Sequence, residues 1–199
     1  MNYVVESYLL AAILAVLYGG SAVATDPEVF MDAVQLITSK GYPCEVHHAT
    51  TDDGYILTMQ RIPYGHGERV PLCGAPRPVV FLQHGLLCSS TNWITNLANE
   101  SLGFILADAG FDVWLGNFRG NTYSRSHVRL SPRQHAFWEF SFDEMAKYDL
   151  PAMIDTALNH SGATQLYYVG HSEGTMTAFA QFSQDLEFAE KVKRVFIYN

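Results

Sequence analysis

Gln165 to Phe182, QLYYVGHSEGTMTAFAQF, is the stretch that decides the fold. Leu166 to Val169 is a short run of apolar, aromatic and β-branched residues, which favours a buried strand. The pentapeptide Gly170 to Gly174, GHSEG, follows at once, and apolar residues at helical spacing come after it. A strand, G-x-S-x-G and a helix make a nucleophile elbow, in which a sharp turn lifts the serine above the sheet edge. We therefore predict that Ser172 is a nucleophile, on a turn shaped by Gly170, His171 and Gly174.

The proton acceptor for such a serine is harder to find. In this architecture the catalytic acid and then the histidine follow the serine along the chain. Beyond Gly174 the chain offers Asp185, Glu187 and Glu190 but no histidine, since all eight histidines lie at or before position 171. His171 adjoins Ser172 but lies on the tight turn itself and is a poor candidate. The sequence thus predicts a nucleophile without its base.

A second stretch carries chemistry of the same kind. Val79 to Leu82 predicts a compact strand, and QHGLLCSS follows it over residues 83–90. A strand that ends in His84-Gly85 and continues into an apolar loop fits an oxyanion-side loop, in which one backbone N–H helps to bind a tetrahedral oxyanion. The other interpretation is a plain strand-to-loop turn with a half-buried His84.

Helices and strands alternate from Val79 onward, which predicts a mostly parallel sheet with helices on both faces. A helix is expected over Asp26 to Ser39, and a hairpin around Asp52-Asp53-Gly54. Ser141 to Glu144 is a capping box, and Pro151 should kink or divide the helix that it opens. The other expected elements are strands over 45–51, 55–62, 111–115 and 195–198 and a helix over 101–109.

Two further features allow both a functional and a structural interpretation. Arg119 and Arg125, in the polar loop over 116–126, could bind an anion, although hydrogen bonds that anchor the loop are the simpler reading. The aromatic patch over 137–140 could touch a substrate, with core packing as the default. His47 and His48 face opposite ways on a strand, so no metal site is expected. No cofactor motif is present either.

Composition places the chain among globular proteins. It has 199 residues, 48% hydrophobic and 16% charged, with a net charge of −8 and no basic run, which argues against a nucleic-acid partner. Residues 1–24 look like a signal peptide ending in Ala-Val-Ala, with an uncleaved anchor as the alternative; after cleavage no stable membrane span is expected. Asn99 and Asn159 lie in glycosylation sequons. In a secreted chain, three cysteines mean a free thiol, an intermolecular bond or a missing partner. Cys44 and Cys73 flank the hairpin and could pair, and Cys88 fits a packed free thiol.

With these motifs in place, the sequence resembles the acid lipase family of the α/β-hydrolases, which includes gastric, lysosomal and insect lipases. The matching phrases run from about Asp26 to Asn199 and include GYP, TDDGYIL, LQHGLL, DVWLGN, FDEMA and YVGHS. The resemblance implies hydrolysis of lipid esters, such as triacylglycerols or cholesteryl esters, at a lipid–water interface in a secreted or lysosomal setting. By position it implies that Ser172 is the nucleophile and that the backbone N–H groups of Leu86 and Glu173 form the oxyanion hole, with His84 and Gly85 in support.

Two departures from the family pattern matter. Glutamine usually stands where this chain has Glu173, and a carboxylate would oppose a nearby oxyanion. Family members also continue with further strands, a cap and the catalytic Asp and His. Residues 25–199 are therefore expected to be the amino-terminal part of an α/β-hydrolase lipase domain, truncated after the strand that follows the nucleophile helix. The alternative is a non-catalytic secreted form that binds lipid or acts as a decoy.

Overall fold

The computed structural model describes residues 25–67 and 76–198. The chain divides at Met31 into two compact units. The described part of the first unit holds one 3-10 turn, η1 (Pro27–Phe30), which is capped by the Asp26 side chain. The signal-peptide prediction for residues 1–24 and the possible partner Cys73 lie outside the described residues, so both stay predictions.

The single helix expected over Asp26 to Ser39 is wrong. The second unit begins with its own helix, α2 (Ala33–Ser39), which is separate from η1. Asp32 explains the break, because its side chain accepts from the Gln35 N–H while the Gln35 side chain accepts from the Asp32 N–H. Such a capping box starts a helix and needs a non-helical residue at the cap. Asp32 is accordingly extended, with φ −78° and ψ 176°.

The second unit is built on one mixed sheet in the order β1-β2-β4-β3-β6-β7, with β5 paired to β2. The strands β4, β3, β6 and β7 are parallel to one another, whereas β1, β2 and β5 pair antiparallel at one end. The expected hairpin is confirmed. The strands are β1 (Glu45–Thr50), β2 (Tyr55–Ile62), β3 (Val79–Gln83), β4 (Asp112–Gly116), β5 (Ser126–His127), β6 (Leu166–His171) and β7 (Val192–Tyr198).

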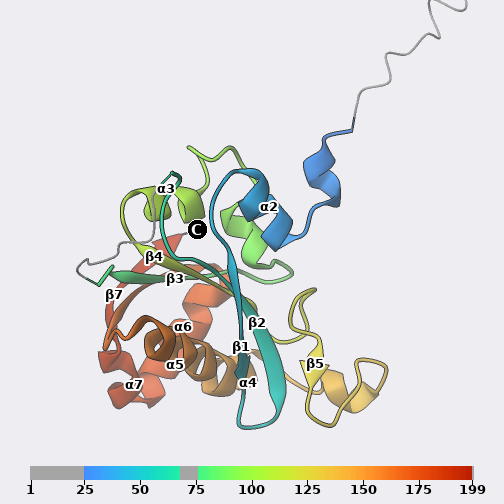
Figure 1. Ribbon diagram of the computed structural model, residues 1–199. Helices are drawn as coiled ribbons and strands as arrows, with labels where there is room; N and C mark the ends of the chain where they lie inside the picture. Colours follow the sequence, from blue (N-terminus) through green and yellow to red (C-terminus); the bar gives the residue numbers. More distant parts are fainter. Residues whose placement is uncertain (1–24, 68–75, 199) are drawn as a thin grey trace, which may run out of the picture. The chain divides into compact units, whose positions relative to one another are not determined.

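Helices cover both faces of this sheet (Figure 1). On one face lie α2, the 3-10 turn η2 (Ser90–Trp93) and α3 (Leu102–Asp108); on the other lie α5 (Leu150–Ser161), α6 (Glu173–Gln184) and α7 (Leu186–Glu190). The order confirms the prediction of an α/β fold with a mostly parallel sheet. The short helix α7 was not predicted; the Asp185 side chain caps it by accepting from the Phe188 N–H.

The helix opened by the Ser141 capping box continues past Pro151 without a division. It consists of α4 (Phe142–Glu144), the π-helical turn η4 (Met145–Asp149) and α5. Pro151 has no N–H to donate, and the turn before it is already π-helical, with the Leu150 N–H donating to the Met145 carbonyl five residues earlier. The irregularity thus falls on η4, directly before Pro151, and Gly162 ends the helix with φ +70°.

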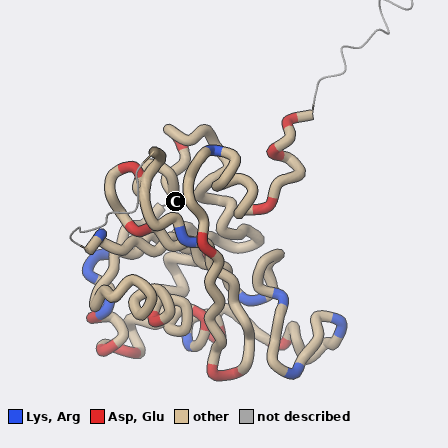
Figure 2. Tube along the Cα trace, in the orientation of Figure 1, with Lys and Arg blue, Asp and Glu red and all other residues tan. Residues whose placement is uncertain are grey.

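The core lies on the face covered by α5 and α6, where Phe81, Trp114, Met153 and Tyr168 are fully buried. In the part of the chain that the structure describes, basic residues are scattered rather than gathered in one patch (Figure 2). Among the same residues, no helix has the length and apolar character needed to cross a membrane.

Candidate active site

The predicted elbow is a sharp turn between β6 and α6. Ser172 links the strand to the helix with φ 50° and ψ −113°, and its side chain is exposed. Only one other non-glycine residue among those described, Leu87, has a positive φ. Holding an L-residue there costs about 1–3 kcal/mol, and such strain gathers at functional sites.

Two glycines make this turn possible by removing side chains that would block it. A Cβ on Gly170 would lie 2.7 Å from the Thr175 backbone nitrogen, and a Cβ on Gly174 would lie 2.6 Å from the Gln83 carbonyl oxygen. Both contacts are with backbone atoms, which cannot swing aside. The G-x-S-x-G spacing therefore reflects the close approach of α6 to the ends of β6 and β3.

The loop after β3 lies directly against the elbow. The two strands are in register, with Gln83 opposite Gly170. A Cβ on Gly85 would lie 3.1 Å from the Ser172 Cβ and 2.9 Å from Nδ1 of His171. The structure thus brings together the two predicted halves of the site, which are almost 90 residues apart in the chain.

His84 fixes the position of this loop, and both of its ring nitrogens form hydrogen bonds. Nε2 accepts from the Phe118 N–H at 3.2 Å and from the Asn121 side-chain amide at 3.0 Å. Nδ1 must then carry the proton, which it donates to the Gly85 carbonyl at 2.8 Å. Burial lowers the pKa of His84 to about 4, and the nearby His171 adds to the effect. His84 is therefore a neutral support and has no nitrogen left to act as a base.

The Gly85 carbonyl is fixed from two sides, because the Cys88 N–H also donates to it, at 3.2 Å. In a trans peptide the C=O and the next N–H point in opposite directions. The Leu86 N–H is thereby turned away from these partners, and neither it nor the Glu173 N–H, at the first position of α6, donates to any acceptor among the described residues. Both predicted oxyanion donors are thus available.

A cavity of about 870 Å³ opens beside these donors. Its walls come from the loop after β3, from the segment after β4 and from the aromatic segment before α4. Residues that line it include Leu86, Leu87, Phe118, Asn121, Trp138, Phe140 and Glu173. Of the predicted aromatic patch, Phe137 is a core residue, which confirms core packing for this member. Trp138 and Phe140 line the cavity, and their contact with a substrate stays a prediction.

Arg119 anchors the loop after β4. Its guanidinium donates to Asp53 in the β1–β2 turn at 2.6 and 2.9 Å, and to Asp149 in η4 at 2.7 and 2.8 Å. It also stacks 4.0 Å from the centre of the Tyr55 ring. The anchoring interpretation is therefore confirmed for Arg119. Arg125 is exposed and lies 5.5 Å from the centre of the Trp138 ring.

The two carboxyl groups around Arg119 differ in their titration. Burial opposes ionisation of Asp53, but hydrogen bonds from Arg119 and Thr51 outweigh it and lower its pKa. Asp149 is fully buried, and burial raises its pKa to about 6 against the pull of Arg119. Asp149 was not predicted from the sequence, although its position on the inward, otherwise apolar face of the helix is a signal that could have indicated it.

No general base for Ser172 is found among the described residues. No histidine there is hydrogen-bonded to the Ser172 hydroxyl, and Nδ1 of His171 is buried without a partner. Within residues 25–67 and 76–198 no cluster of three or more His, Cys, Asp or Glu could hold a metal ion. Asn99 and Asn159, the predicted glycosylation sites, are both exposed.

Comparisons with known proteins agree with this arrangement. Residues 33–97 match a family described as a partial alpha/beta-hydrolase lipase region, and residues 78–199 match the alpha/beta hydrolase fold. A human lysosomal acid lipase/cholesteryl ester hydrolase is 57% identical over 89% of this chain and 44% of its own length. A mouse gastric triacylglycerol lipase is 55% identical over 86% of this chain and 43% of its own. The chain thus spans less than half the length of these relatives.

Solved structures share the fold at much lower sequence similarity. An esterase of Pyrococcus furiosus superposes with a TM-score of 0.54 at 16% identity, covering 79% of this chain and 51% of that one. An epoxide hydrolase of Vigna radiata superposes with a TM-score of 0.51 at 18% identity, covering 77% and 39%. At this identity the likeness concerns the fold alone.

Proposed function

Because the chain belongs to the acid lipase family of the α/β-hydrolases, we propose that it contributes the nucleophile and the oxyanion hole of a lipid ester hydrolase. The observation that carries this proposal is the joint geometry of the elbow and the loop after β3. Ser172 is exposed on a strained turn, Gly85 packs against it, and the two N–H groups expected to bind an oxyanion have no acceptor of their own among the described residues.

The reaction would proceed in two halves. The Ser172 hydroxyl loses its proton to a base as its oxygen bonds to the ester carbonyl carbon. The oxyanion of the tetrahedral intermediate accepts hydrogen bonds from the N–H groups of Leu86 and Glu173. The C–O bond to the alcohol then breaks, and the alcohol takes the proton from the base. Water then loses a proton to the same base as its oxygen bonds to the acyl carbon; the bond from that carbon to the Ser172 oxygen breaks, the fatty acid leaves, and the base returns the proton to Ser172.

The base and its orienting carboxylate belong, in this proposal, to a longer product of which residues 25–199 are the amino-terminal part. Two observations support it. The relatives are more than twice as long as the matched region, and both nitrogens of His84 are occupied by structural hydrogen bonds. The substrates proposed are neutral lipid esters such as triacylglycerols or cholesteryl esters, in keeping with the activities for which those relatives are named.

A secretory route to the cell exterior or the lysosome is part of the proposal. It draws on the signal-like residues 1–24 and on the exposed positions of Asn99 and Asn159. Endoglycosidase treatment followed by mass analysis tests the two asparagines. If the treatment lowers the mass of Asn99→Gln but not that of the variant that lacks both asparagines, Asn159 is one of the glycosylated residues.

The decisive experiment is reaction with a fluorescent alkylphosphonate ester, followed by mass analysis of the peptide that contains Ser172. It is run on the secreted chain and on the product of the complete transcript, beside Ser172→Ala and a matched control, Ser183→Ala, which removes an exposed hydroxyl from the same helix. In the product of the complete transcript, we expect labelling of Ser172 that Ser172→Ala abolishes and Ser183→Ala leaves unchanged. A folded complete product that is not labelled would overturn the proposal and favour the non-catalytic lipid-binding form.

A further inference from the structure

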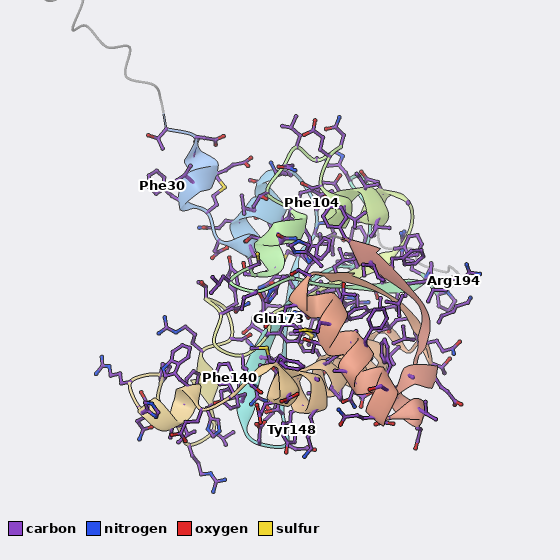
Figure 3. All side chains as sticks on the ribbon, turned by 180° about the vertical axis from the view of Figure 1, so that it is seen from behind. Phe30, Phe104, Phe140, Tyr148, Glu173 and Arg194 are labelled. Carbon is purple, nitrogen blue, oxygen red and sulfur yellow. The ribbon has the colours of Figure 1, made fainter. Side chains whose placement is uncertain are left out.

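Glu173 places a carboxyl group inside the candidate site. It is the first residue of α6, directly after Ser172, and its side chain lines the same cavity as Leu86. In Figure 3 it lies at the start of α6, near the middle of the molecule, with Phe140 on the neighbouring segment. Its backbone N–H is one of the two proposed oxyanion donors, so the side chain and the donor belong to one residue.

The Glu173 carboxyl has no partner among the described residues. It forms no hydrogen bond or ion pair there, it is half-buried, and this burial raises its pKa. The cationic Arg119 on the cavity wall is already engaged by Asp53 and Asp149, and the neighbouring His84 is neutral. The other charged or titratable groups that line the cavity are Cys88 and Arg125. Those on the elements packed beside it include Asp143, Glu144, Lys147, Tyr148, Asp149, Tyr168 and His171.

The ionised side chain and an oxyanion would compete for the same stabilisation. Helix α6 has 12 residues, and the positive end of its dipole points at Ser172 and Glu173. A carboxylate at this position shares that field and adds a like charge beside the developing oxyanion, in a cavity where charges are screened less than in water. A neutral carboxylic acid does neither.

We propose that Glu173 is a charge gate on the oxyanion site, open when its carboxyl is protonated and opposed to reaction when it is ionised. The inference rests on the proposed function of Ser172 and deepens it at the same site. It also bears on the ligand, because an ionised Glu173 disfavours anionic lipids and the fatty-acid product within the cavity, and favours neutral esters.

The test is the rate of Ser172 labelling by a neutral alkylphosphonate ester between pH 4 and pH 8, in the product of the complete transcript. Native protein is compared with Glu173→Gln, which keeps the shape and removes the charge. The ratio of the two rates cancels the titration of the catalytic base, which both proteins share. We expect the ratio of variant to native rate to be near one at the acid end and to rise with pH to on the order of tenfold.

Two further variants guard the interpretation. Glu187→Gln removes an equal charge from the exposed first turn of α7 and should give a ratio that does not change with pH. Glu173→Met should repeat the rise seen with glutamine, because only the loss of charge matters. A flat ratio for both Glu173 variants, with Ser172 still labelled, would overturn the charge gate alone. Absence of Ser172 labelling in every variant would overturn the proposed function together with this inference.

Discussion

Two polar regions border the same cavity and are built in opposite ways. Around Arg119 the charged groups are engaged with one another, since Asp53 and Asp149 accept the guanidinium hydrogen bonds and the Tyr55 ring covers its face. At the elbow several polar groups are unmatched within the described part of the chain: the Glu173 carboxyl, Nδ1 of His171 and the two proposed oxyanion donors. A matched network fixes the position of a loop, whereas unmatched groups retain the capacity to bind something else.

The largest expected effect breaks the matched region. Arg119→Met leaves Asp149 fully buried without its cation, and we expect a loss of about 3–5 kcal/mol in the free energy of unfolding. Arg125→Met is the matched control, because Arg125 is exposed and lies over the Trp138 ring, so its loss should cost about 0.5 kcal/mol or less. Urea unfolding at pH 7 measures the free energy of unfolding of both variants. Equal losses in the two variants would contradict the view that Arg119 is a buried structural residue and Arg125 is not.

The next effect concerns His84, which connects the two regions. Its folded-state pKa, about 4, lies below the ordinary value of 6.5. The unfolded chain therefore takes up the proton first as the pH falls, and stability is lost between pH 6.5 and pH 4. By linkage this residue alone should cost about 2–3 kcal/mol between pH 7 and pH 4.5. Urea unfolding at both pH values checks it, and the pH dependence should shrink in His84→Gln but not in the exposed control His48→Gln.

A smaller loss of stability, with a large loss of reactivity, is expected from Gly174→Ala. The added methyl would meet the backbone oxygens of Gln83 and His84 at 2.6 and 2.7 Å, so α6 must move away from β3. We expect about 1–3 kcal/mol of destabilisation and a fall of at least about a hundredfold in Ser172 labelling. Gly162→Ala, at a positive φ with open space around it, should cost about 1 kcal/mol and leave labelling unchanged.

The smallest effect tests the unmatched region. Glu173→Gln removes a carboxyl without a partner among the described residues, so the stability should change by no more than about 0.5 kcal/mol. The sign is set by the raised pKa: the folded state holds its proton longer than the unfolded chain, so the native protein loses stability as the pH rises. The variant should therefore be slightly more stable at pH 8. A clear loss of thermal stability would mean that Glu173 has a structural partner.

Sequence patterns predicted the elbow, the hairpin and the alternation of strands and helices because each depends on neighbours within a few residues. Ser172 on its turn and the hairpin around Asp52-Asp53-Gly54 are local features of this kind, and both are present. The break before α2 was missed because Asp32 can either lie on the exposed side of a continuing helix or cap a new one, and its pairing with Gln35 decides between them.

The site was only partly predictable for a related reason. The motifs indicated that Ser172, Gly85 and Leu86 act together, but they gave no sign of what fixes the loop in place. The partners of His84 come from Phe118 and Asn121, and those of Arg119 come from the hairpin turn and from η4, all at long range in the sequence. Such pairings depend on how the elements pack, which periodicity does not encode.

The π-helical turn at Met145–Asp149 has a consequence for how this chain can change over time. A π-helical turn holds about one residue more than the α-helical turn that it replaces. Losing one codon within this turn would leave a regular α-helix whose two flanks keep their positions, so Asp149 would stay beside Arg119. Losing one codon within α5 would instead rotate the residues on one side of the cut by about 100°. An in-frame deletion should therefore be tolerated better in the π-helical turn than in the helix that follows it.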